Sequence, residues 1–173
     1  GGNRTLGWVD RSGKTETLPL KPASYLYPRL APDGRSMAVE IEGPNHDFHF
    51  CDFARTVLSQ VSTDGMSHNP VWTPDGKRLA YRSWIGGGMT MWWMNADRSG
   101  APERLDPDGI QQNPVSFSPA GKFLSFDQKS AETDDDALVK PVAAGGEARA
   151  IARSKFKEGS AKFSPDGRWI AYS

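Results

Sequence analysis

One short pattern recurs four times along the chain at a nearly constant interval. It consists of a large apolar residue, a proline two places later, then a glycine and a basic residue, and it leads into an apolar run. The four copies are LAPDGRSMAVEI (30–41), WTPDGKRLAYRS (72–83), FSPAGKFLSFDQ (117–128) and FSPDGRWIAYS (163–173). Their prolines are separated by 42, 45 and 46 residues. This period predicts a fold built from successive copies of one supersecondary unit.

Each copy begins with the composition of a tight turn. Proline presets φ for the first corner, aspartate tolerates the second, and glycine accepts the positive φ that closes a hairpin. These turn residues are Pro32, Asp33, Gly34, Pro74, Asp75, Gly76, Pro119, Gly121, Pro165, Asp166 and Gly167. Ala120 replaces the aspartate in the third copy, and we expect that turn to form because Gly121 is retained.

Beyond each turn, large and small side chains alternate. Met37 and Val39 flank Ala38, for example, and the other copies repeat this period of two residues, which is that of a strand. Two further strand-like runs follow in each repeat, as in DFHFCDF (47–53) and TVLSQVS (56–62). Four short strands per repeat predict an all-β fold, a β-propeller of four-stranded antiparallel blades.

The phase of the repeat divides the chain into blades. DRSG occurs at 10–13 and at 97–100, in each case 22 residues before a turn proline, so the N-terminal segment corresponds to the third and fourth strands of a blade. We therefore expect three complete blades and two complementary half blades. Their ranges are 1–25 (half blade), 26–66, 67–110, 111–157 and 158–173 (half blade, first and second strands). NPVSFSP has one residue more than NPVWTP, which predicts a β-bulge in the third complete blade.

Two half blades leave unpaired strand edges, and such edges favour association. The chain has three ways to satisfy them. It closes into a four-bladed ring, it exchanges half blades with a second copy to form an eight-bladed homodimer, or it is part of a longer propeller. The two half blades have complementary strands, which favours the closed ring and the homodimer over a part of a longer propeller. Blades of this type pack at angles that suit rings larger than four blades, so we expect the homodimer rather than the four-bladed ring.

These motifs resemble the TolB-type, WD-repeat-like propeller family, whose blades carry an aromatic residue and Ser-Pro-Asp-Gly before an alternating strand. WVDRSGK, YPRLAPDGR, VWTPDGKRLAY and SFSPAGK occur in the order found in propeller regions of bacterial serine/threonine kinases. The resemblance implies a bacterial propeller and an extracytoplasmic location. It implies no particular function, because the motif describes turns and packing.

Composition and missing motifs exclude several classes of function. Lys plus Arg and Asp plus Glu both number 21, so a formal charge of zero argues against nucleic acid as a partner. No apolar run is long enough for membrane insertion. The sequence contains no G-x-S-x-G, H-E-x-x-H, P-loop or C-x-x-C motif, so it indicates no catalytic residue and no cofactor.

Two short segments resemble metal-binding sequences. HDFHFCD (46–52) carries two histidines and a cysteine, but strand alternation directs His46 away from His49 and Cys51, so we expect no metal site there. ETDDDA (132–137) lacks the ligand spacing of a calcium loop, and we expect it to be a solvated acidic loop.

A functional surface on a propeller is expected at the loops that enter the innermost strands, because rigid scaffolds carry function on loops. The candidate binding residues there are Tyr27, Arg29, His68, Asn69, Gln112 and Asn113. Two functions fit: a non-catalytic module that binds a protein or peptide, and a hydrolase-type propeller or the propeller of a larger peptidase or lactonase. The sequence favours the first, because the positions around Arg29, Asn69, Asn113 and Ala161 do not form the acidic ring that a metal-dependent hydrolase needs.

Overall fold

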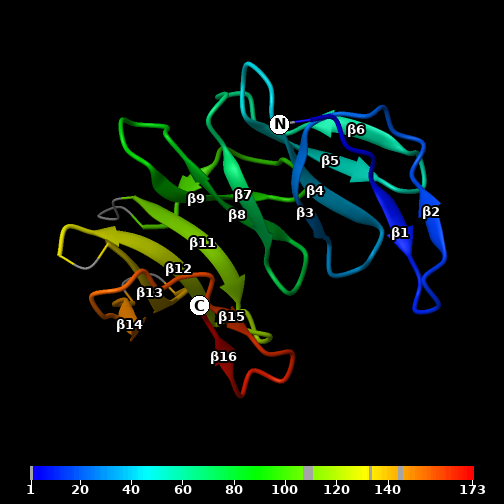
Figure 1. Ribbon diagram of the computed structural model, residues 1–173. Coiled ribbons are helices and arrows are strands. Elements are labelled where there is room, and N and C mark those ends of the chain that lie inside the picture. Colours follow the sequence, from blue (N-terminus) through cyan, green and yellow to red (C-terminus); the bar gives the residue numbers. More distant parts are fainter. Residues whose placement is uncertain (1, 107–110, 133, 144–145) are drawn as a thin grey trace. The chain divides into compact units, whose positions relative to one another are not determined.

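The computed structural model describes residues 2–106, 111–132, 134–143 and 146–173, and all regular elements in these ranges are β-strands (Figure 1). The all-β expectation is therefore confirmed. The chain divides into two compact units, Gly1–His68 and Asn69–Ser173. In the part of the chain that the structure describes, no helix has the length and apolar character needed to cross a membrane.

The first unit contains one two-stranded and one four-stranded antiparallel sheet, β1–β2 and β3–β4–β5–β6. Their strands are β1 (Gly7–Val9), β2 (Thr15–Thr17), β3 (Tyr25–Leu30), β4 (Ser36–Ile41), β5 (Asp47–Asp52) and β6 (Val57–Gln60). The core of this unit is formed by buried side chains of β3, β4 and β5, namely Tyr25, Met37, Val39 and Cys51. Leu6, Leu18 and Leu20 pack against it and attach the two-stranded sheet to the four-stranded one.

The second unit contains two four-stranded sheets, β7–β8–β9–β10 and β11–β12–β13–β14, and the two-stranded sheet β15–β16. The strands are β7 (His68–Trp72), β8 (Arg78–Ser83), β9 (Thr90–Asn95), β10 (Glu103–Arg104), β11 (Gln112–Phe117), β12 (Phe123–Ser130), β13 (Asp134–Pro141), β14 (Arg149–Ala152), β15 (Lys162–Phe163) and β16 (Ile170–Ala171). One apolar cluster runs through both four-stranded sheets, from Val71 and Met91 to Phe117, Phe126 and Leu138.

The predicted turns are confirmed. Gly34, Gly76, Gly121 and Gly167 all have φ between 68° and 70°, a backbone region that glycine adopts without strain. The turn that contains Ala120 closes like the others, because the Gly121 amide donates to the Ser118 carbonyl at 2.8 Å. It lacks the side-chain hydrogen bonds that an aspartate accepts at this position in other turns, such as those from Lys77 N–H and Thr73 Oγ1 to Asp75 Oδ1 at 3.0 and 2.6 Å.

Strand alternation is also confirmed, with both faces buried in the second strand of each four-stranded sheet. Val39, Leu79 and Leu124 are fully buried on one face, and Ala38 and Ser125 on the other. Small residues are required on that second face because a neighbouring element packs closely there. The predicted bulge lies in β11, where the register with β12 shifts between Pro114 and Ser116. A further shift, which we did not predict, lies in β3 between Leu26 and Arg29.

The expectation of a solvated acidic loop at 132–137 is wrong from Asp134 onward, whereas Glu132 lies in an exposed turn. β13 begins at Asp134, and the Asp136 side chain is only 2% exposed and accepts a hydrogen bond from Arg153 Nε at 3.0 Å. The arginine lies 17 residues later, directly after β14, so a local pattern does not reveal that this carboxylate is compensated.

Candidate functional site

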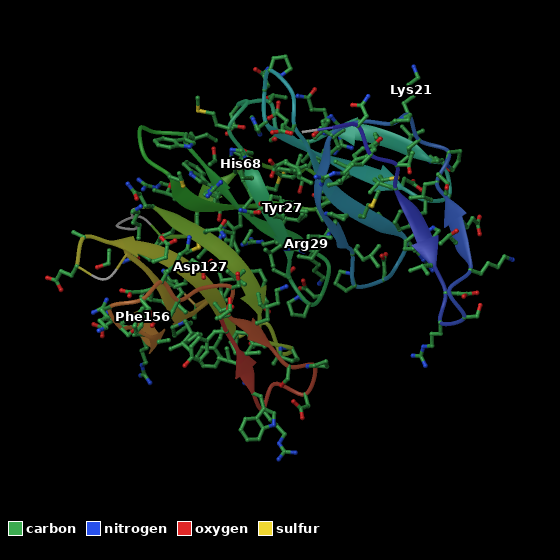
Figure 2. The ribbon with its side chains drawn as sticks, in the orientation of Figure 1. Lys21, Tyr27, Arg29, His68, Asp127 and Phe156 are labelled. Carbon is green, nitrogen blue, oxygen red and sulfur yellow. The ribbon has the colours of Figure 1, made fainter. Side chains whose placement is uncertain are left out.

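The six candidate binding residues lie in the first strands of the three four-stranded sheets: Tyr27 and Arg29 in β3, His68 and Asn69 in β7, Gln112 and Asn113 in β11. Figure 2 labels Tyr27, Arg29 and His68. Tyr27 is exposed, whereas Gln112 is buried. Gln112 Nε2 donates to Gln128 Oε1 at 2.9 Å and to Asp106 Oδ2 at 3.0 Å, so this side chain joins β11 to β12 and to the chain before it. It is therefore less suited to contact a ligand than its neighbour Asn113.

A strained backbone recurs where these strands begin. Tyr27, Asn69 and Ser160 have φ of 47°, 52° and 56°, and each stands five residues before a turn proline. Gln111, directly before β11, has φ 46°. Left-handed conformation in residues other than glycine costs roughly 1–3 kcal/mol each and is concentrated at functional sites. Its recurrence at one position of the repeat shows that the blade itself imposes this geometry.

In the second unit, a chain of hydrogen bonds links the starts of successive first strands. Asn69 Nδ2 donates to Asn113 Oδ1 at 2.7 Å, and the Asn113 side chain in turn donates to Asp127. The Ser160 amide donates to Asp127 Oδ1 at 2.9 Å. This group, which we call the Asn69–Asp127 chain, fixes the orientation of both amides and of the carboxylate before any ligand binds.

The Asn69–Asp127 chain borders a cavity of about 580 Å³. Its lining residues are Arg82, Met89, Gln111, Asn113, Asp127, Lys129, Asp135, Lys157, Gly159, Ser160 and Ser173. The wall carries charges of both signs, including an ion pair between Lys157 Nζ and Asp135 Oδ2 at 2.8 Å. Among the described lining residues there is neither a histidine nor a cysteine, so the cavity is suited to hydrogen bonding and charge recognition.

Asp127 has an unusual environment in this wall. Burial raises the pKa of its carboxyl group above the ordinary value, and the hydrogen bonds from the Ser160 amide and the Asn113 side chain act in the opposite direction. We did not identify Asp127 from the sequence. The hairpin register contains the signal that was missed, because β11 and β12 pair Asn113 directly with Asp127.

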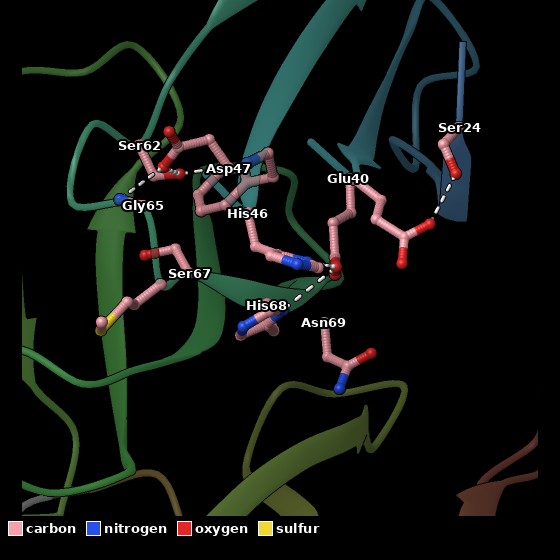
Figure 3. Close-up of polar contacts among 12 residues, drawn as sticks. Ser24, Glu40, His46, Asp47, Ser62, Gly65, Ser67, His68 and Asn69 are labelled. Carbon is pink, nitrogen blue, oxygen red and sulfur yellow. Dashed lines mark hydrogen bonds and ion pairs between the residues drawn. The ribbon is translucent and has the colours of Figure 1, made fainter. Parts of the chain in front are cut away.

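A second polar cluster lies in the first unit and consists of Glu40, His46 and His68 (Figure 3). One potential ligand atom from each residue lies within 4.8 Å of the other two. The Nδ1 atoms of His68 and His46 lie 3.0 and 3.5 Å from Glu40 Oε1. The side chains are exposed by 2% for Glu40, 18% for His68 and 37% for His46. The sequence does not reveal that these side chains lie close together, because Glu40 belongs to β4, His46 directly precedes β5 and His68 begins β7.

No family model matches the chain. An uncharacterized peptidase, YuxL of Bacillus subtilis (strain 168), is 27% identical over 151 residues, which are 84% of this chain and 21% of the peptidase. The Tol-Pal system protein TolB of Gluconobacter oxydans (strain 621H) is 34% identical over 67 residues, or 39% of this chain and 14% of TolB.

Solved structures give a broader match. TolB from Acinetobacter baumannii has a TM-score of 0.81 at 21% identity, over 97% of this chain and 42% of that protein. A protein assigned as TolB from Agrobacterium tumefaciens has a TM-score of 0.84 at 19% identity, over 99% of this chain and 62% of that protein. The chain has the TolB-type β-propeller fold. The resemblance found in the turn and strand motifs is thus confirmed for the fold.

The fold also occurs in peptidases. A structure from a study of two prolyl endopeptidases has a TM-score of 0.60 at 17% identity, over 89% of this chain and 26% of that protein. In all the relatives described here, the chain spans less than two thirds of the relative's length.

Proposed function

We propose that this propeller is a non-catalytic recognition module that binds a protein or peptide through the cavity beside the Asn69–Asp127 chain. The observation that carries the proposal is that hydrogen-bonded polar groups of this chain, Asn113, Asp127 and Ser160, line a cavity of about 580 Å³. Preorganised polar groups on a rigid scaffold reduce the cost of ordering on binding.

The chemistry of the wall favours a peptide segment as the ligand. Asn113 and Asp127 offer an amide and a carboxylate, which suit peptide N–H and C=O groups or a cationic side chain. Lys129 and Lys157 lie on the same wall and suit an acidic side chain or a chain terminus. The volume is within the range of about 300–1,000 Å³ that small ligands and short segments occupy.

The test is selection of binders from a random peptide library on the purified wild-type chain, followed by affinity measurement on variants. We expect Asn113→Ala to weaken the binding of the selected peptides at least about fivefold, since truncation of a central contact costs more than about 1 kcal/mol. Lys122→Ala, an exposed residue outside the cavity lining, is the matched control and should leave affinity unchanged. Peptides that bind both variants as tightly as the wild type would contradict the proposed site.

A second candidate is the propeller part of a larger peptidase. It is supported by the 27% identity to YuxL over 84% of this chain and by the prolyl endopeptidase neighbour. In that case the cavity would still bind peptides, but a separate catalytic domain would cleave them. An activity screen with peptide, ester and lactone substrates, with and without divalent metals, separates the two candidates from a catalytic propeller. Turnover that Asp127→Asn abolishes would overturn the non-catalytic proposal.

We also propose that two copies of the chain exchange half blades to form a homodimer. Support comes from β1–β2 and β15–β16, which are two-stranded sheets where the others have four strands. Pairing of β15–β16 of one copy with β1–β2 of the other would complete two sheets. Light scattering should then give twice the chain mass of 19.0 kDa. A mass of one chain at micromolar concentration would rule out the exchange.

We also propose that the protein is extracytoplasmic, a location that fits its TolB-like fold. We propose no nucleic-acid partner. Cell fractionation with an antibody against the chain tests this location, and recovery of the protein only with cytoplasmic markers would contradict it.

A further inference from the structure

We propose that Glu40, His46 and His68 form a binding site for a divalent transition-metal ion of the Zn²⁺ class. This site is distinct from the peptide cavity, and its residues all belong to the first unit. It does not depend on the proposed recognition function.

The distances in the cluster are close to those of a metal coordination sphere. Ligands about 2.0–2.1 Å from a tetrahedral Zn²⁺ are about 3.3 Å apart. The two contacts of Glu40 Oε1 with His68 Nδ1 and His46 Nδ1, at 3.0 and 3.5 Å, lie on either side of this value. The two histidine rings are 5.1 Å apart between centroids and are tilted by 48°, and both lie beside the Glu40 carboxylate (Figure 3). His46 has the most solvent-exposed side chain of the three, and metal binding would require its ring to turn until its nitrogen closes the third edge.

The type of ligand selects the class of metal. Two imidazoles and one carboxylate suit Zn²⁺ and its neighbours, whereas Ca²⁺ and Mg²⁺ prefer oxygen ligands alone. Glu40 supplies a negative charge that is only 2% exposed, which a dication compensates. Because His46 is 37% exposed, the site is open to solvent on one side, for entry of the ion and for a water ligand.

The segments that carry the histidines are held in place by a second carboxylate. Asp47 is buried and accepts hydrogen bonds from Ser62 Oγ at 2.7 Å, Gln60 Nε2 at 2.9 Å and the Gly65 amide at 3.1 Å. These bonds hold the segment that leads to His68 next to Asp47, the residue that follows His46.

Backbone hydrogen bonds add to this support. The His46 amide donates to the Gly65 carbonyl at 3.0 Å, and the Ser67 amide donates to the His46 carbonyl at 3.1 Å. The two histidines are thus positioned by a shared framework, as effective metal sites require.

The experiment is titration of the purified chain with Zn²⁺ alone at neutral pH, followed by isothermal calorimetry and by ¹H–¹⁵N spectra of the imidazole rings. We expect one Zn²⁺ per chain and shifts of the ring nitrogens of His46 and His68, with His49 unaffected. His46→Gln and His68→Gln should each weaken binding at least about tenfold, because loss of even an outer-shell partner costs 10–100-fold.

The matched control is His49→Gln, which removes the third histidine from β5 and leaves the cluster intact. Its Zn²⁺ affinity should equal that of the wild type. Circular dichroism of each metal-free variant separates loss of a ligand from loss of folding, and His46→Gln is the more tolerant change because this side chain is partly exposed. The proposal is overturned if Zn²⁺ produces neither heat nor spectral shifts, which would leave a hydrogen-bonded cluster only. It is equally overturned if both cluster variants bind like the wild type, or if His49→Gln loses binding to the same extent.

Discussion

The surroundings of Asp127 affect the charge of its carboxyl group in two opposite ways. Burial disfavours its charge, while the Ser160 amide and the Asn113 side chain donate hydrogen bonds that favour it. The net effect is a raised pKa, so the carboxylate is less stable in the fold than in water. Binding sites often retain such groups, because a ligand donor stabilises the charge that the free protein supports poorly.

We predict that Asp127→Asn stabilises the protein at neutral pH by less than about 1 kcal/mol, since the group is partly solvated. A raised pKa means that the folded chain binds the proton more tightly than the unfolded chain. Stability from Asp127 is therefore fully present below the ordinary carboxyl pKa and is lost as pH rises through the raised value. Denaturant titrations of wild type and variant across pH should show the difference at neutral pH and its disappearance in acid. A variant that is less stable than the wild type at neutral pH would contradict this assignment.

Tyr27 gives a second test at this scale. It has φ of 47° and a 50% exposed aromatic side chain. Burial of the side chain therefore offsets little of the backbone strain. Asparagine tolerates left-handed backbone better. We predict that Tyr27→Asn stabilises the fold by about 0.5 kcal/mol, which is less than the roughly 1–3 kcal/mol cost of such a residue because asparagine relieves the strain only in part. Tyr172→Asn is the matched control, because Tyr172 is 55% exposed and is not among the residues with positive φ. Equal changes in melting temperature for both variants would show that strain at Tyr27 is not the cause.

At the level of elements, the turns of neighbouring sheets in the second unit pack against each other. A Cβ atom at Gly121 would lie 3.6 Å from Pro74 Cδ, and one at Gly167 would lie 3.3 Å from Pro119 Cδ. Each proline therefore sets φ in its own turn and also contacts the glycine of the next one. This double role explains why proline and glycine recur together at the period of the repeat.

The third turn offers a stabilising substitution. In the second and fourth copies the turn aspartate accepts a hydrogen bond from a Thr73 or Ser164 hydroxyl at 2.6 Å, and this contact is the main cause of the lowered pKa of Asp75 and Asp166. Ser118 occupies the same position before Ala120. We predict that Ala120→Asp stabilises the protein by about 0.5 kcal/mol, the lower end of the range for one hydrogen bond.

The pH dependence of that gain is the check. A lowered pKa gives stability that is present above the ordinary carboxyl pKa and is lost as pH falls through the lowered value. Chemical denaturation should therefore show the gain at neutral pH but not in strong acid. Ala120→Asn, which keeps the acceptor without the charge, should retain its gain in acid. A gain for Ala120→Asp that persists in strong acid would contradict the hydrogen-bond explanation.

How much the sequence reveals depends on how local the interaction is. Turns, alternation and the β11 bulge were predictable because each is determined within a dozen residues. The Asn113–Asp127 pair was within reach, since it follows from the hairpin register once the turn is fixed. The cluster of Glu40, His46 and His68 could not be predicted from the sequence. The path of residues 61–67 depends on the contacts of Asp47, and no periodic pattern in the sequence encodes those contacts. The alternation of side chains along the strand correctly predicted that His46 and His49 point in different directions. It gave no information about the residues that lie next to His46, which are Glu40 and His68.

At the scale of the whole molecule, the absence of net charge has a physical consequence. The formal charge is zero at pH 7, so electrostatic repulsion between copies is weakest near neutrality. Several large apolar side chains are exposed at the same time, with Trp169 at 69%, Phe156 at 66% and Tyr172 at 55%. Association of copies is therefore expected to rely on apolar contacts and unpaired strand edges rather than on charge.

Trp169 is the residue at which this expectation is best tested. It directly precedes β16, in the two-stranded sheet that we propose to be exchanged, and it is mostly exposed. In an exchanged dimer its indole would be buried, and a charged residue there would cost about 2 kcal/mol or more in each copy. We predict that Trp169→Lys converts a dimer into single chains of 19.0 kDa in light scattering, and that added salt does not restore the dimer.

Trp84→Lys is the control for that change, because it adds the same charge at a 44% exposed tryptophan between β8 and β9. It should raise solubility near neutral pH as much as Trp169→Lys does and leave the mass unchanged. If both variants lose the dimer, general charge repulsion explains the effect and the exchanged sheet does not. If neither variant does, the apolar surface beside β16 is not part of the interface.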